Sequence, residues 1–145
     1  MAITTAMCTS FKGELLGGTH DLDSHTLKIA LIKASPSGTY NAATTNYSDV
    51  TGNSDESSGS NYSAGGQNLD GATISTTGTT AIVDFTDEVF TNVTTSADGC
   101  IIYNSSASNK AICVIDFGGT VSATAGDLTI QFPAADASNA VIRIA

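Results

Sequence analysis

The chain has little charge, almost no proline, no tryptophan and no long apolar run. Charged residues make up 13% of its 145 residues, and 14 Asp and Glu against 5 Lys and Arg give a net charge of −9. A surface this acidic repels phosphate backbones and anionic lipid headgroups, so we expect neither a nucleic-acid nor a membrane partner. No stretch approaches the roughly 20 apolar residues of a membrane-spanning helix. Hydrophobic residues nevertheless reach 41%. This excludes a disordered acidic tail and predicts one folded domain, residues 1–145.

Cysteine is also scarce. The three thiols, Cys8, Cys100 and Cys113, are odd in number and form no C-x-x-C pair. This excludes a zinc site of the usual spacing and makes a disulfide framework a poor fit. The first residues lack the basic region of a signal peptide, so we expect assembly in a cytoplasm.

What is abundant is Ser, Thr, Asn and Gly between runs rich in Ile and Val, which is typical of all-β domains. The predicted fold is an antiparallel β-sandwich or jelly roll with one short N-terminal helix. Residues 1–18 are predicted to form a helical arm, and residues 19–145 the sandwich. Gly- and Asn-containing turns separate the predicted strands, which are 26–34, 72–76, 79–85, 88–94, 99–104, 110–117, 127–132 and 140–144. The polar stretch 41–68 is predicted to be a long loop.

The predicted helix covers residues 4–16. Met7, Phe11 and Leu15 recur at the spacing of one helical face, and Gly17-Gly18 gives a stop signal. Because so short a helix is marginal alone, its apolar face must pack on its own sheet or on a neighbouring subunit. These three side chains are therefore candidate interface residues.

One hairpin is predicted in register. If the strands joined through Ser105–Ser108 pair symmetrically, Tyr103 faces Lys110 and Cys100 faces Cys113. Both thiols lie among apolar residues, so we predict that they are neighbours, reduced and buried.

The densest set of possible metal ligands is the six-residue stretch from His20 to His25, which also contains Asp21 and Asp23. Two imidazoles and two carboxylates could hold a divalent cation. However, Leu22 separates the acids and the glycine and glutamate of a calcium loop are missing, so a solvated turn is the preferred interpretation. There is no G-x-S-x-G motif and no histidine elsewhere. We therefore expect no catalytic residue, no metal and no cofactor, and a metal-dependent hydrolase built on His20 and His25 is the least favoured alternative.

The segment Ser-Gly-Ser-Asn-Tyr-Ser-Ala-Gly-Gly-Gln-Asn-Leu at residues 58–69 resembles a motif of small virion proteins of tailed bacteriophages. In that motif an acidic residue precedes S-G-x-x-Y-x-A-G-G and an apolar position, and here Asp55-Glu56 takes the acidic place. The central loop is richer in Ser and Asp than the motif. The resemblance continues through most of the chain, at residues 1–16, 80–85, 99–106, 111–118 and 131–144.

This resemblance implies a virion structural protein without enzymatic activity. The preferred role is a head decoration, or cement, protein that binds the major capsid protein and copies of itself, as a trimer or dimer, on the outer lattice. A tail, neck or appendage module is the alternative. Within the motif, Tyr62, Gly65 and Gly66 are either interface residues or parts of a tight loop held by its own tyrosine.

Overall fold

The computed structural model describes residues 2–145, and most of its regular structure is antiparallel sheet. The all-β sandwich with one short N-terminal helix is confirmed. The larger sheet has five strands, in the order β1 (Ala6–Met7), β7 (Lys110–Ile130), β6 (Glu88–Asn104), β2 (Leu27–Lys33) and β3 (Gln67–Asn68). The smaller sheet has three, in the order β4 (Thr73–Thr77), β5 (Thr80–Asp84) and β8 (Ile142–Ile144).

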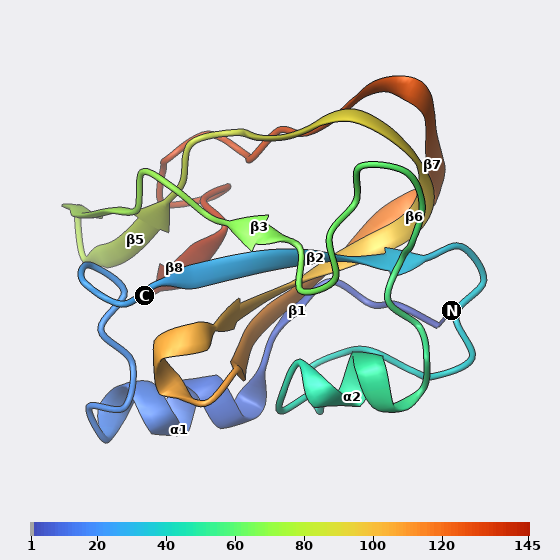
Figure 1. Ribbon diagram of the computed structural model, residues 1–145. Helices are drawn as coiled ribbons and strands as arrows, with labels where there is room; N and C mark the ends of the chain where they lie inside the picture. The colour runs from blue at the N-terminus through green and yellow to red at the C-terminus, as the bar shows by residue number, and fades with distance from the viewer. Residues whose placement is uncertain (1) are drawn as a thin grey trace.

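Different elements cover the two faces of the larger sheet (Figure 1). Helices α1 (Thr9–Leu16) and α2 (Ser48–Gly52) lie on one side of it, while the far half of the β6–β7 ribbon curves over the other side. The hydrophobic core lies within these layers. Strand β2 lies inside the sheet, between β6 and β3, and its middle is apolar on both faces. Residues 29–32 accordingly have no exposed surface.

Strands β6 and β7 are each continuous where the sequence predicts two strands. The turn signal at residues 97–99 is a bulge, because the β6–β7 ladder shifts between Ala97 and Gly99. The Asp98 carboxylate there accepts hydrogen bonds from the Ser35 N–H at 2.8 Å and from the Thr120 hydroxyl. In β7, Gly118 has a positive φ of 76° but does not end the strand. The turn residues predicted at 97–99 and at Gly118 therefore lie within continuous strands, as local irregularities that do not end β6 or β7.

The predicted helix over residues 4–16 and the predicted arm over residues 1–18 are wrong in their first half, and residue 1 lies outside the described residues. Ala6 and Met7 pair with β7, and the Cys8 N–H donates to the Ile112 carbonyl at 2.9 Å. The helix begins only at Thr9 and ends as predicted before Gly17. Ladder hydrogen bonds to β7 satisfy the backbone of residues 6–8, so this segment belongs to the sheet.

The predicted register of the β6–β7 hairpin is also wrong. Tyr103 pairs with Ala111, and a bulge after Ile102 shifts the ladder further, so Cys113 faces Ile102 and Cys100 faces Ile115. The connection is asymmetric because it contains a 3₁₀ turn, η1 (Ser105–Ala107), followed by two residues with positive φ. The two thiols are diagonal neighbours on one face and, as predicted, are reduced and buried. Cys8 is also free and buried.

The polar stretch 41–68 is well anchored. It contains α2 and a fully buried carboxylate, Asp55, which accepts hydrogen bonds from the Tyr40 hydroxyl at 2.6 Å, the Gly38 N–H at 2.7 Å and the Lys33 ammonium at 3.0 Å. Burial alone raises the pKa of Asp55, but these hydrogen bonds outweigh it and hold the pKa well below its usual range. The Asp55 network thus fastens the loop to β2.

Candidate functional site

Residues 58–69 form a loop that its own tyrosine holds against β2. The Tyr62 hydroxyl accepts a hydrogen bond from the Leu31 N–H at 2.9 Å and donates one to the Glu56 carboxylate at 2.9 Å. The same Glu56 oxygen accepts from the Gly65 N–H at 2.6 Å. Burial raises the pKa of Tyr62, so the phenol stays neutral and keeps its proton to donate.

The paired glycines Gly65 and Gly66 both have positive φ, and Gly66 also approaches the sheet closely. Gly66 has a φ of +70°, and a Cβ at this position would lie 1.8 Å from the Ile29 carbonyl oxygen. Gly65 also has a positive φ, and its carbonyl accepts a hydrogen bond from the buried Tyr103 hydroxyl at 2.7 Å. Tyr62, Gly65 and Gly66 therefore make the contacts expected of the pinned-loop alternative.

Met7, Phe11 and Leu15, which were predicted to share one helical face, differ in their burial and do not all lie on the helix. Phe11 has no exposed surface and packs edge-on against His20, with ring centroids 4.9 Å apart, so it presents nothing to a partner. Leu15 and Met7 are only partly buried, and Met7 lies on β1. The neighbouring Leu16 is 91% exposed. The interface role predicted for Phe11 is therefore replaced by a core role, because the helix packs on its own sheet.

The histidine stretch is a turn, but it is less solvated than predicted. His20 is buried, with one ring nitrogen 2.8 Å from Glu14 and the other 3.1 Å from the Asn104 amide. The same amide lies 2.9 Å from His25, and the Asp21 carboxylate accepts hydrogen bonds within the turn. Within residues 2–145, no three His, Cys, Asp or Glu side chains gather as metal ligands would.

The cysteines are poor nucleophiles. Burial raises the pKa of Cys8 to about 12 and that of Cys100 to about 12, and it raises the pKa of Cys113 well above its ordinary value. The thiolate, which is the reactive form, is therefore strongly disfavoured at all three positions.

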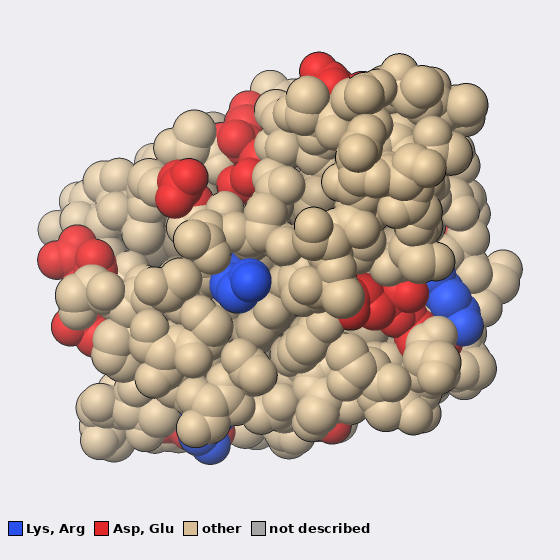
Figure 2. All heavy atoms as spheres, in the orientation of Figure 1, with Lys and Arg blue, Asp and Glu red and all other residues tan. Residues whose placement is uncertain are grey.

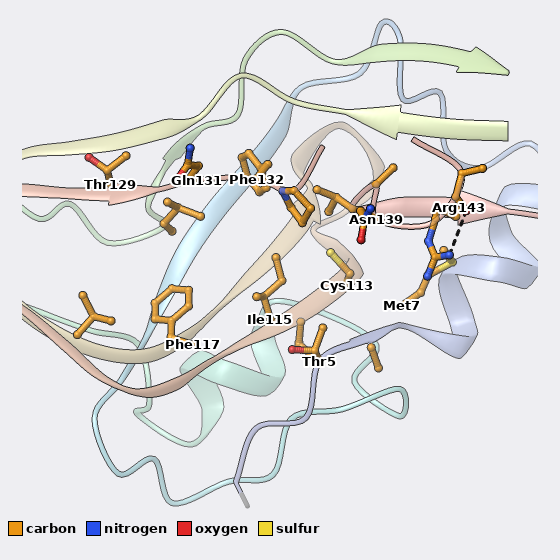
Figure 3. Close-up of a pocket in the computed structure, with 18 of the residues that line it drawn as sticks. Thr5, Met7, Cys113, Ile115, Phe117, Thr129, Gln131, Phe132, Asn139 and Arg143 are labelled. Carbon is orange, nitrogen blue, oxygen red and sulfur yellow. Dashed lines mark hydrogen bonds between the residues drawn. The ribbon is translucent and has the colours of Figure 1, made fainter. Parts of the chain in front are cut away.

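An open cleft of about 820 Å³ lies between β7 and the C-terminal segment that follows it. One wall comes from β1 and the first half of β7, where Met7, Cys113, Ile115 and Phe117 project from the sheet (Figure 3). The opposite wall comes from the end of β7 and the segment 131–145. Figure 3 shows Ile115 and Phe117 directed toward Phe132 across the cleft.

The cleft is lined mainly by apolar side chains, with fewer polar ones. The polar lining consists of neutral hydrogen-bonding side chains and one cation, Arg143, whose guanidinium donates to the Ala137 carbonyl at 3.2 Å. Val121, on β7 at the cleft, keeps 41% of its surface exposed. Such a site can bury an apolar segment of a partner and orient it with a few polar contacts. The arrangement offers no paired acid and base for catalysis.

Sequence reasoning identified only Met7 among the cleft residues. The alternation Cys113, Ile115, Phe117 marks one face of a strand, and this signal was available in the sequence. That this face remains open depends on how the segment 131–145 passes over it.

The rest of the surface is mainly uncharged, with acidic side chains in separate groups and few cations on the face drawn in Figure 2. None of the helices over residues 2–145 is long and apolar enough to cross a bilayer. Comparisons with protein-family models, curated proteins and solved structures give no match to this chain.

Proposed function

We propose that this chain is a non-enzymatic structural protein of a bacteriophage virion, and that it decorates the outer capsid lattice. In this role it binds the major capsid protein and copies of itself, and it stabilises the shell against internal pressure. The resemblance at residues 58–69 supports the class of protein. The net charge of −9 favours the outer surface, because an acidic chain is repelled by DNA packed inside.

The open apolar cleft is the structural observation that carries the proposal. Exposed apolar surface that lies together in a concave site is typical of places where another protein binds. Val121, Ile115 and Phe117 lie on the open side of β7, where an extended or looped segment of a capsid subunit can cover them. Many such contacts over a repeating lattice convert a modest affinity per site into firm attachment.

The test uses particles assembled without this chain, to which the purified protein is added. We expect saturation at a copy number set by the capsid lattice and a higher temperature of DNA release. Val121→Glu, in the cleft, should abolish binding. Val89→Glu should not, because Val89 is similarly exposed, at 39%, but lies outside the cleft.

A protein that saturates at the much lower copy number of a tail component would refute decoration and favour the tail, neck or appendage alternative. Failure to bind any part of the particle would refute the virion role itself. Equal binding by the two valine variants would show that the cleft is not the contact site.

A further inference from the structure

The outer edge of the smaller sheet is unprotected. Strand β4 pairs with β5 on one side only, and all five of its residues are exposed, including Ile74 at 52%. Over residues 2–145, no backbone hydrogen bond outside the ladder engages residues 73–77. Proteins usually protect such an edge with charge, proline or a bulge, because its free N–H and C=O groups recruit another strand. Here β4 reads Thr-Ile-Ser-Thr-Thr and has a regular register with β5.

The hairpin turn determines which backbone groups face outward. Thr77 pairs with Thr80 across a two-residue turn in which Gly78 has a φ of +61°. In such a turn the closing pair is hydrogen-bonded, and hydrogen-bonded and free positions then alternate along the strand. The N–H and C=O groups of Ile74 and Thr76 therefore point away from β5, ready to pair with another strand.

We infer that β4 pairs antiparallel with β4 of a second copy of this chain, around a twofold axis at Ser75. In this register Ile74 of each copy lies opposite Thr76 of the other, and the two residues exchange both backbone hydrogen bonds. The result is one six-stranded sheet running from β8 of one copy to β8 of the other. Because the two strands present the same surface, the contact closes as a dimer.

The absence of charged side chains along β4 permits a second copy to occupy this edge. Two molecules of net charge −9 repel each other over most of their surfaces, but no charged residue occurs between Asp70 and Asp84. Strand β4 itself therefore sets no acidic side chain against the same strand of a second copy. This inference rests on the edge itself and holds wherever the protein sits on a particle.

Cross-linking tests the register. At a twofold axis through Ser75, the two Ser75 residues form a non-hydrogen-bonded pair with Cα atoms about 4.5 Å apart, within the range of a disulfide. Ser75→Cys should give a covalent dimer on oxidation, and the native thiols should not interfere because all three are buried. Thr77→Cys is the matched control, because its two copies would lie about 14 Å apart, and it should stay uncross-linked.

Sedimentation equilibrium of the full chain tests the oligomeric state. The native protein should have twice the mass of one chain. Thr76→Pro, which removes an outward N–H that β5 does not use, should halve that mass while the circular dichroism spectrum stays native. A monomeric or trimeric native protein, or equal cross-linking of the two cysteine variants, would overturn the inference.

The two proposals fail separately. If Thr76→Pro remains native and still binds particles while the native protein is a monomer, the edge inference is wrong and the proposed function stands. If the dimer forms and does not bind particles, the proposed function is wrong and the edge inference stands.

Discussion

Replacement of Asp55 by asparagine should remove a large part of the stability of this protein. Asp55 is completely buried and accepts hydrogen bonds from Tyr40, Ser37, Gly38 and Lys33, at 2.6 to 3.0 Å. The amide that replaces the carboxylate carries no charge, and its NH₂ group faces donors. Breaking a buried ion pair at one partner costs about 3–5 kcal/mol. Because Lys33 is partly exposed, we expect the lower end, about 3 kcal/mol out of a typical total of about 5–15 kcal/mol.

The same substitution should change the dependence of stability on pH. The pKa of the Asp55 carboxyl lies below its unfolded value of about 3.9, so the unfolded chain binds the extra proton. The stability that the lowered pKa of Asp55 contributes is complete above about pH 5, and it is lost as the pH falls through 3.9 toward the lower folded-state pKa. Asp55→Asn should therefore flatten the acid limb. Some slope should remain, because hydrogen bonds from His20 and Lys110 outweigh burial and also lower the pKa of Glu14.

Urea unfolding between pH 2 and pH 7 measures both effects. Asp21→Asn is the matched control, since Asp21 is an exposed carboxylate that accepts hydrogen bonds within a turn, and this variant should remain close to the native protein. A loss below about 1 kcal/mol for Asp55→Asn at pH 7, or an unchanged acid limb, would refute the role given to the buried network.

Three further predictions concern the loop, the helix and the thiols. Gly66→Ala should lower the free energy of unfolding by at least about 2 kcal/mol, because it adds left-handed backbone strain and a clash with the Ile29 carbonyl. Limited proteolysis should then cut the variant at residues 58–69. An equally stable variant that is not cut would contradict this prediction. Phe11→Ala should cost about 3–5 kcal/mol in urea unfolding and Leu16→Ala less than about 0.5 kcal/mol, and similar losses would show that the helix does not pack as described. A thiol reagent at pH 8 should label all three cysteines only after unfolding. Cys113 is 4% exposed, so rapid labelling of Cys113 in the folded protein would show that the cleft opens more widely than in this structure.

The periodicity of the sequence determined the class of fold and the interior position of one strand. The middle of residues 26–34 is apolar on both faces, which favours a strand covered on both sides, and β2 lies inside the larger sheet between β6 and β3. Gly17 ended the helix as predicted, because a helix stop is a local property of the chain. Apolar surroundings likewise predicted that Cys100 and Cys113 are buried.

Contacts between distant residues decided the rest. Ala6 and Met7 carry a helical spacing, yet they form a strand because β7 offers them a ladder more than 100 residues away in sequence. The Ala97–Gly99 signal reads as a turn, but pairing on both flanks makes it a bulge within one long strand. The sequence motif did not decide between an interface role and a loop-holding role for Tyr62, because its hydrogen-bond partner is the Leu31 N–H on strand β2. Local patterns fix what a segment can become, but which alternative forms depends on hydrogen bonds and burial that exist only after the chain has folded.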